Sequence, residues 1–255
     1  MNIFILNKRS GIFIILICII LLSALMIGRS NSISVFGKQK ELPIYCVDKG
    51  EEKTISISFD AAWGNEDTEK LIEILDKYNV KATFFVVGEW VDKYPESVKA
   101  LSDAGHEIMN HSNTHPHMPK LSDDNIRKEV EECNEKIEKV TGIKPILFRA
   151  PYGDYNNNLV SCIKNCGMYC IQWNVDSLDW KDISANEICD RVISKVSPGS
   201  IVLFHNAAKN TPEALPKVLD KLQGDGYKII PISQLILADN YDIDLTGKQK
   251  ARKSE

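Results

Sequence analysis

The sequence predicts an α/β protein built on a parallel sheet of about seven strands. From Thr54 onward, strand patterns alternate with helix patterns about seven times, which indicates parallel pairing. Reactive polar residues follow several of these strands. No G-x-G-x-x-G or G-x-x-x-x-G-K-[ST] motif is present, which disfavours the nucleotide-binding versions of this architecture. The alternation alone allows either a closed barrel or an open, doubly wound sheet.

Length and composition fit one sizeable globular domain with additional segments. The chain has 255 residues, of which 44% are hydrophobic and 26% charged. Its 31 basic and 35 acidic residues give a net charge of -4, which argues against bulk nucleic-acid binding. We expect a monomer without a nucleic-acid partner.

The first 29 residues have the pattern of a membrane anchor. Lys8 and Arg9 precede a nearly unbroken apolar run from Ile12 to Ile27, close to the lower length limit for a spanning helix. We predict an uncleaved single-pass anchor over 1–29, with the remaining domain outside the cytoplasmic membrane. A cleaved signal peptide is the alternative.

The rest of the chain divides by pattern into three parts. Residues 30–52 lack periodicity and are predicted to be a spacer, and residues 53–238 form the alternating domain. Residues 239–255 are predicted to be a polar tail, of which the stretch from Lys248 to Lys253 is basic and solvated.

The first half of the domain begins with a strand pattern. Residues 54–59 alternate polar and apolar side chains, which is typical of a strand with one buried face. The following predicted elements are a helix over 66–78, a strand over 82–87, a helix over 89–103 and a short strand over 106–110.

The second half carries clear helix caps. Ser122 is the expected N-cap of a helix that ends near Gly142, and Ser184 with Glu187 forms a capping-box pattern. The other predicted elements are strands over 146–149, 168–175, 200–204 and 227–230, helices over 158–166, 184–196 and 212–223, and a last segment over 232–238.

Seven cysteines raise the possibility of disulfides in an exported chain. Cys18 falls in the predicted anchor. Cys162 and Cys166 share a helix face, and Cys170 falls in the next strand. We expect buried free thiols.

Two histidines form a candidate metal site. His111 and His115 stand four positions apart, so a helical turn would place both on one face. Both imidazoles could then reach one ion at about 2.0–2.1 Å, the usual zinc–nitrogen distance.

Other reactive residues fall where strands are expected to end. They are Asp60, Arg149, Asp176, Asp179 and His205. In β/α barrels the chemistry gathers at the carboxyl ends of strands. A metal-bound water, a carboxylate base and an imidazole acid oriented by a second carboxylate such as Asp179 could together hydrolyse an ester or an amide.

Five motifs in order resemble those of a known family. They are Ser58-Phe59-Asp60, His111-Ser112-Asn113-Thr114-His115, Arg149-Ala150-Pro151-Tyr152-Gly153, Asp176-Ser177-Leu178-Asp179-Trp180 and Ile201-Val202-Leu203-Phe204-His205. Over about residues 53–235 the chain resembles the polysaccharide deacetylases, the NodB-homology group or carbohydrate esterase family 4. The resemblance implies a distorted (β/α) barrel.

The resemblance also implies roles for the reactive residues. Asp60 would be the general base, held in place by Arg149, and His111 and His115 would bind a divalent metal, usually zinc. Asp179 would tether His205, the general acid. The expected oxyanion and substrate-binding residues are Tyr152 through its backbone N–H, Pro151, Gly153, Asp176, Trp180 and Leu203, of which Trp180 and Leu203 would enclose the acetyl methyl group.

One position departs from the family pattern. The first motif normally has a second aspartate that binds the metal, and here that position is Ala61. Alanine cannot ligate, so weaker zinc binding is expected. His117 is close to the histidine pair and could substitute, although a solvated loop histidine is the preferred interpretation. The same departure resembles a sporulation-associated branch of the family.

The sequence therefore predicts hydrolytic removal of N-acetyl groups from an extracellular amino-sugar polymer. The resemblance points to peptidoglycan or a chitin-like polymer, in spore or cell-wall maturation. Two alternatives remain: a catalytically weak or inactive relative that binds glycan, and an O-acetyl esterase. The absence of H-E-x-x-H disfavours a zinc protease.

Overall fold

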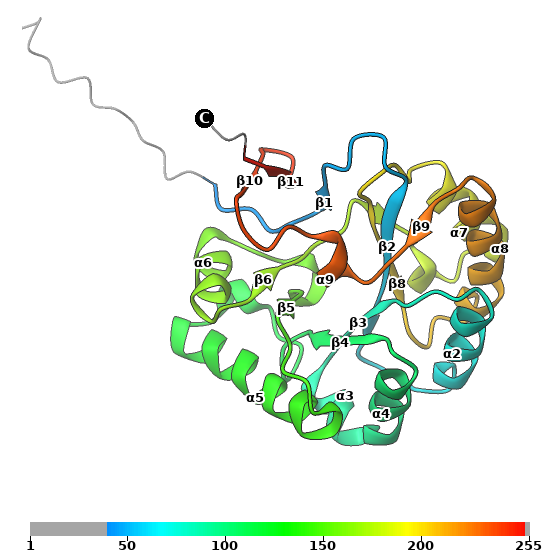
Figure 1. Cartoon of the computed structure of the whole chain (residues 1–255). Helices are drawn as coiled ribbons and strands as arrows, with labels where there is room; N and C mark the ends of the chain where they lie inside the picture. The colour runs from blue at the N-terminus through cyan, green and yellow to red at the C-terminus, as the bar shows by residue number, and fades with distance from the viewer. Residues whose placement is uncertain (1–39, 253–255) are drawn as a thin grey trace, which may run out of the picture. The chain divides into compact units, whose positions relative to one another are not determined.

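A parallel β-sheet organises the domain, and strand β2 lies in its interior (Figure 1). The computed structural model describes residues 40–252, so the predicted anchor at 1–29 lies outside the described residues. In the part of the chain that is described, no helix combines the length and apolar character needed to cross a membrane. Residues from Lys40 onward form one compact unit.

The sheet has the strand order β6-β5-β4-β3-β2-β8-β7, and β9 adds alongside β2. Every pairing in it is parallel, which confirms the predicted fold class. The strands are β2 (Thr54–Ala61), β3 (Thr83–Val86), β4 (Glu107–Asn110), β5 (Leu147–Phe148), β6 (Tyr169–Cys170), β7 (Val175–Asp176), β8 (Ile201–His205) and β9 (Lys228–Ile229).

The prediction of one strand over 168–175 is wrong, because this stretch forms both β6 and β7. These two strands stand at opposite ends of the strand order, yet only residues 171–174 separate them. A chain of that length spans at most about 18 Å from Cys170 to Val175. The sheet must therefore curl until its two ends approach one another, as in an incompletely closed barrel.

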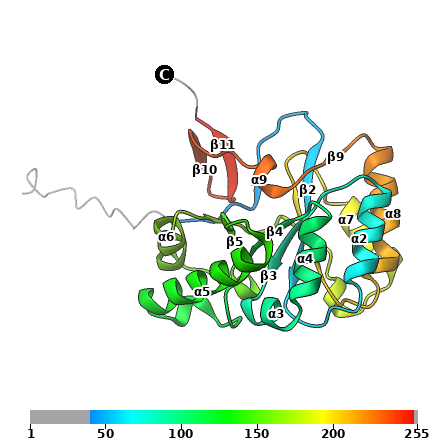
Figure 2. The same cartoon turned by 60° about the horizontal axis from the view of Figure 1, so that its bottom comes forward.

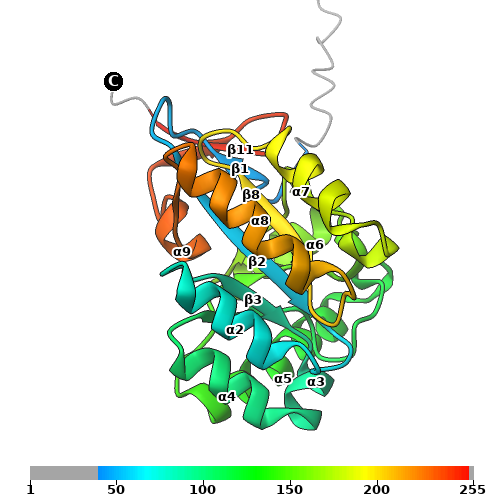
Figure 3. The same cartoon turned by 90° about the vertical axis from the view of Figure 1, so that its right-hand side faces the viewer.

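Helices cover the convex face of the curled sheet. Figure 3 shows α8 and α2 lying across β2, β3 and β8. The helices are α2 (Thr68–Lys77), α3 (Gly88–Lys93), α4 (Pro95–Asp103), α5 (Asp123–Thr141), α6 (Asn157–Asn165), α7 (Ala185–Ile193), α8 (Thr211–Gly224) and α9 (Ile232–Leu235).

The prediction of one helix over 89–103 is wrong, since a break at Tyr94 separates α3 from α4. Tyr94 has φ -133° and ψ 52°, outside the helical region. Pro95 explains the break, because the ring of a proline disfavours the helical conformation of the residue before it. Pro95 then occupies the first turn of α4, where its missing N–H costs nothing.

The predicted helix caps are confirmed. The Ser122 side chain accepts a hydrogen bond from the N–H of Asn125, and Gly142 ends α5 with φ 73°. Ser184 and Glu187 form the complete capping box at the start of α7. Such caps satisfy backbone groups that a helix end leaves unpaired.

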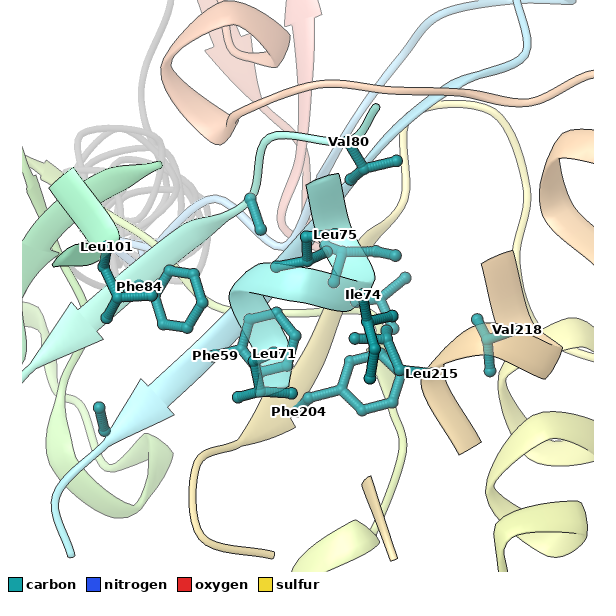
Figure 4. Close-up of a cluster of buried hydrophobic side chains, with 14 of the residues drawn as sticks. Phe59, Leu71, Ile74, Leu75, Val80, Phe84, Leu101, Phe204, Leu215 and Val218 are labelled. Carbon is teal, nitrogen blue, oxygen red and sulfur yellow. The ribbon is translucent and has the colours of Figure 1, made fainter. Parts of the chain in front are cut away.

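Strand β2 separates an apolar layer from a polar interior. Ile55, Ile57 and Phe59 belong to the main buried cluster, where Phe59 stacks on Phe84 and Phe204 at 4.7 and 5.6 Å between ring centroids. Figure 4 shows these rings packed beneath α2 and α8. Alternate residues of a strand face opposite sides, so this packing turns Ser56, Ser58 and Asp60 toward the other face.

A second, three-stranded sheet differs from the predicted spacer and tail. Strand β11 (Lys248–Ala251) pairs in parallel with β1 (Cys46–Val47) and antiparallel with β10 (Tyr241–Ile243). Figure 2 shows α9, β10 and β11 gathered on one side, apart from α2, α4 and α5.

A buried glutamine joins this second sheet to the domain. Gln249 is fully buried, and its side chain both donates to and accepts from the backbone of Leu237 at 2.8 Å. A segment held by side-chain amide hydrogen bonds shows no alternation of apolar residues in its sequence. Residues 241–251 were therefore predicted to be part of a polar tail and not strands.

The six cysteines of the described residues are free thiols, and Cys133, Cys162, Cys170 and Cys189 are buried. Burial raises the pKa of the Cys133 and Cys170 thiols to about 12. Both are therefore protonated and unreactive at neutral pH.

Candidate active site

The predicted site residues meet around one cavity at the carboxyl ends of the strands. Its volume is about 470 Å³, within the range of small-ligand sites. The lining residues are Asp60, Ala62, Trp63, His111, His115, Tyr152, Gly153, Trp173, Asp176, Trp180, Leu203 and His205. Arg149 and Asp179 are fully buried. Pro151 is also buried and does not line the cavity.

Asp60 and Arg149 form a buried ion pair. Asp60 ends the polar face of β2, and its Oδ1 accepts a hydrogen bond from Arg149 Nη1 at 2.7 Å. Arg149 Nη2 also donates to Ser58 Oγ at 2.9 Å, and the guanidinium lies 4.1 Å from the centre of the Phe85 ring.

Burial alone would raise the pKa of Asp60, but Arg149 and the neighbouring histidines outweigh it and hold the pKa below its usual value. The carboxylate is ionised at neutral pH.

His111 presents a lone pair to the cavity. Its Nδ1 lies 2.8 Å from the carbonyl oxygen of Arg149, and a carbonyl can only accept, so Nδ1 carries the proton. Burial lowers the pKa of His111 and favours the neutral ring. Nε2 is therefore an acceptor, and it faces Asp60 Oδ2 at 3.6 Å. This distance is too long for a hydrogen bond.

The prediction that His111 and His115 lie on a helical turn is wrong. Residues 111–115 form a loop after β4, in which Ser112 and His115 have φ of 68° and 58°. The two rings still adjoin, with centroids 5.0 Å apart at an interplanar angle of 67°. Burial is the main cause that lowers the pKa of His115 to about 4.

Helix α5 anchors this histidine loop. Glu129 Oε2 accepts hydrogen bonds from the backbone N–H groups of Asn113 and Thr114 at 2.9 and 2.8 Å, and its Oε1 accepts from Thr114 Oγ1 at 2.8 Å. Glu132 and Lys136 hold the Asn113 side chain. Side chains therefore fix a backbone conformation that no repeating pattern encodes.

The residues present do not make up a catalytic zinc site. Such sites use three protein ligands, and Ala61 stands at the position where the resemblance places the third. Ala61 belongs to the apolar cluster behind β2 and does not line the cavity. No group of three metal-ligating side chains occurs within residues 40–252.

His117 does not complete the donor set, because it does not line the cavity and its Nδ1 is engaged by Asp154. Its Nδ1 is 2.6 Å from Asp154 Oδ2, and its ring stacks on Tyr152 with centroids 4.3 Å apart. The His117 side chain is 46% exposed, which confirms the preferred interpretation of a solvated loop histidine.

Asp179 and His205 form the second charged pair. Asp179 Oδ1 lies 2.8 Å from His205 Nδ1 and accepts from the N–H of Trp180. Its Oδ2 accepts from the N–H of His205 at 2.8 Å and from Thr211 Oγ1 at 2.6 Å.

Four hydrogen bonds thus fix the Asp179 carboxylate. Burial of the His205 ring opposes its protonation, but the hydrogen bond and charge of Asp179 outweigh that effect and raise the pKa of His205. Asp179 engages His205 Nδ1, and the ring lines the cavity. The other ring nitrogen, Nε2, can therefore donate a proton to a bound ligand.

The third motif shapes one wall of the cavity. Tyr152 adopts φ 61° in the short 3-10 turn Pro151–Gly153, which is unusual for a residue other than glycine. Its ring lies edge-on to His115 at 4.6 Å. At Gly153 a Cβ would come within 2.9 Å of the Trp173 ring, so this wall requires glycine.

Sequence reasoning missed two tryptophans that line the cavity, Trp63 and Trp173. Trp173 lies in the 171–174 crossing, which was predicted to be the interior of a strand. Trp63 is 64% exposed, and with Tyr152 at 57% and Trp180 at 56% it forms an aromatic rim. A tryptophan in a polar loop just after a strand-end aspartate is the signal that could have found Trp63.

Comparisons with known proteins agree with this geometry. A family profile described as polysaccharide deacetylase matches residues 48–171. Peptidoglycan-N-acetylmuramic acid deacetylase PdaA of Bacillus subtilis is 34% identical over 190 residues, covering 73% of this chain and 72% of PdaA. The uncharacterized B. subtilis protein YlxY is 35% identical over 196 residues, covering 76% of this chain and 60% of YlxY.

A pseudoenzyme is among the similar solved structures. BA3943 of Bacillus anthracis, a CE4 family pseudoenzyme, is 37% identical with a TM-score of 0.74, covering 83% of this chain and 74% of that chain. A BA3943 mutant with restored enzymatic activity is 39% identical with the same TM-score, covering 78% and 72% of the two chains. The chain spans 60% of YlxY and 39% of the B. subtilis deacetylase PdaC.

Proposed function

Because this chain belongs to the polysaccharide deacetylase family, we propose that it binds the amino-sugar backbone of peptidoglycan without metal-dependent turnover. One observation carries the proposal. The cavity keeps both charged pairs and an aromatic rim, whereas Ala61 occupies the position of the third metal ligand.

The rim supports a sugar ligand. Trp63, Tyr152 and Trp180 expose large rings around a polar cavity, and grouped exposed aromatic side chains mark binding sites. Pyranose rings present flat C–H faces that pack on such rings. PdaA and PdaC act on peptidoglycan, which supports the same polymer as the ligand here.

The missing ligand argues against turnover. Hydrolysis of an amide at neutral pH needs an activated water, and the metal that supplies it in this family would have only two histidines here. The likeness to BA3943 supports the same conclusion.

The test measures binding and turnover together. The purified full chain, in mild detergent, is sedimented with peptidoglycan sacculi, and released acetate is assayed with added zinc or cobalt. We expect co-sedimentation that Trp63→Ala and Trp180→Ala each weaken about tenfold, and acetate no higher than with Asp60→Asn. Absence of binding, or acetate well above the Asp60→Asn control, would overturn the proposal.

Slow N-deacetylation is the second candidate, and the intact Asp60–Arg149 and Asp179–His205 pairs favour it. The restored activity of the BA3943 mutant supports the idea that this fold retains the remaining machinery. Acetate release that His205→Ala abolishes would favour this candidate. The same assay on O-acetylated glycan separates an esterase from an amidase.

We propose that the domain lies outside the cytoplasmic membrane, held by an uncleaved anchor at 1–29, and acts as a monomer in cell-wall or spore-envelope maturation. The apolar run after Lys8 and Arg9 and the peptidoglycan-acting relatives support this placement. Protease treatment of intact protoplasts tests it: the domain should be digested while a cytoplasmic marker survives. N-terminal sequencing would reveal a cleaved signal peptide.

A further inference from the structure

We propose that the cavity selects an N-deacetylated amino sugar, binding its primary ammonium group in preference to an N-acetyl group. The inference rests on the proposed function, because it specifies which residue of the glycan the same cavity binds. It follows from the finding that the cavity lacks the third side-chain ligand of a catalytic metal site and so can accept another kind of cation.

Two hydrogen-bond acceptors, Asp60 Oδ2 and His111 Nε2, lie side by side in the cavity, and neither donates a proton to the other. Asp60 Oδ1 is engaged by Arg149, whereas Oδ2 makes no hydrogen bond and lies 3.6 Å from His111 Nε2. In the neutral His111 ring, the hydrogen bond from Nδ1 to the Arg149 carbonyl leaves Nε2 as an acceptor with a lone pair. A carboxylate oxygen opposite a lone pair is unfavourable unless a cation or a donor approaches both.

A primary ammonium meets this requirement. It carries three N–H donors, a positive charge and no acceptor. One nitrogen at an ordinary hydrogen-bond distance can reach two acceptors that are 3.6 Å apart. An acetamido group offers one N–H, no charge, and a carbonyl oxygen that itself needs a donor.

The charge balance favours a cation as well. Asp60 and Asp176 line the cavity, and Asp179 lies directly behind His205. Against these three carboxylates stand one guanidinium, Arg149, and one imidazole that can carry charge, His205. The site is therefore net negative whether or not His205 is protonated. A divalent cation bound with a third carboxylate ligand would make the site one charge unit more positive, so the loss of both leaves the site more favourable to cationic ligands.

The aromatic rim supplies the remaining contacts. Trp63 and Trp180 stand at the mouth of the cavity, where they can pack on the faces of a sugar ring. The amine then extends inward to Asp60 and His111. Hydrolytic N-deacetylation is the class of reaction that must supply this ligand, so the protein would bind glycan that an active deacetylase has already modified.

The experiment compares two matched probes. Binding of the glucosamine tetramer and of the N-acetylglucosamine tetramer to the full chain is measured calorimetrically, in EDTA, at low salt and a pH that keeps the amines charged. We expect the glucosamine tetramer to bind at least tenfold more tightly than the N-acetylglucosamine tetramer.

Variants that neutralise single carboxylates identify which residues produce the preference for the glucosamine tetramer. Asp60→Asn should abolish it, but this change leaves Arg149 buried without its partner and can unfold the protein. Asp176→Asn is the gentler variant, because an amide oxygen still accepts the Leu178 N–H that Asp176 Oδ1 binds at 2.9 Å. It should reduce the preference severalfold. Asp190→Asn, on the exposed face of α7, is the matched control and should change nothing.

Each result decides between the possibilities. Equal or tighter binding of the acetylated tetramer overturns the inference and leaves the proposed function standing. If Asp190→Asn reduces the preference for the glucosamine tetramer as much as Asp176→Asn does, the preference comes from general attraction to an acidic protein. That result overturns the inference. If neither tetramer nor sacculi bind, both the inference and the proposed function fail.

Discussion

At the scale of single residues, Ala61 determines what kind of site this is. Its neighbour Asp60 faces the cavity, and Ala61 itself packs among apolar side chains behind β2. The reactive residues could be predicted from sequence because residues at the ends of parallel strands meet at one edge of the sheet. The backbone conformations of three residues could not be predicted, because tertiary contacts hold the positive φ values of Ser112, His115 and Tyr152.

Ala61→Asp should create a metal site. Ala61 is the last residue of β2 and the position of the metal-binding aspartate in the family's first motif, so we expect the longer side chain to turn past the strand end and supply the third ligand. Burying this carboxylate among apolar side chains without metal should cost about 1–3 kcal/mol of folding free energy. We expect a lower melting temperature in EDTA, about one zinc per chain by elemental analysis, and a larger zinc-induced rise in melting temperature than in the wild type. Ala61→Asn has the same shape and a poorer ligand, and serves as the control. Equal zinc responses in the two variants would contradict the expectation.

Asp179→Asn should lower the pKa of His205. In the folded protein burial opposes protonation of this ring, and Asp179 raises its pKa above the ordinary value by outweighing that effect. The stabilisation from this pair is therefore complete below the unfolded pKa of about 6.5 and is lost as pH rises through the folded pKa. NMR titration of the His205 ring, with urea unfolding at several pH values, measures both effects. An unchanged His205 titration would refute the assigned role of Asp179.

At the scale of elements, sequence patterns predicted those with strong local signals. The caps at Ser122 and Ser184 and the helix stop at Gly142 are local signals, and all three are in place. The division of 168–175 into β6 and β7 has no local signal, because it depends on which neighbours each half meets in the curled sheet.

The histidine loop depends on α5 through Glu129. Glu129→Gln removes the charge that accepts the Asn113 and Thr114 N–H groups, and hydrogen bonds to charged groups contribute about 1.5–3 kcal/mol. We expect a loss of about 1–3 kcal/mol in urea unfolding and faster amide exchange at residues 113 and 114. Glu131→Gln, on the exposed side of the same helix, should leave both unchanged. Similar effects from both substitutions would mean that α5 as a whole, and not Glu129, holds the loop.

At the scale of the whole molecule, acid should weaken the fold through a buried histidine. His106 packs against Phe84, its Nδ1 accepts the Ala82 N–H at 3.2 Å, and its Nε2 has no partner. Burial, together with the nearby Lys81, lowers its pKa to about 4, so the unfolded chain binds a proton that the folded chain does not. Its contribution is complete above about pH 6.5 and is lost as pH falls toward about 4.

Melting temperatures between pH 7 and pH 4 check this expectation. His106→Asn keeps an acceptor near the Ala82 N–H without a titrating ring, so the acid-induced fall should be smaller than in the wild type. An equal fall would assign the acid sensitivity to other groups.

The position of β2 between β3 and β8 has a consequence for the order of assembly. Asp60 pairs in register with Phe85 on one side and His205 on the other, so its two neighbours lie 25 and 145 residues away in the chain. Strand partners that are distant in the sequence raise the contact order, which is the mean sequence separation of contacting residues. Chains of high contact order fold slowly. A nascent chain therefore exposes one edge of its central strand until β8 emerges, and an unpaired strand edge promotes aggregation during that interval.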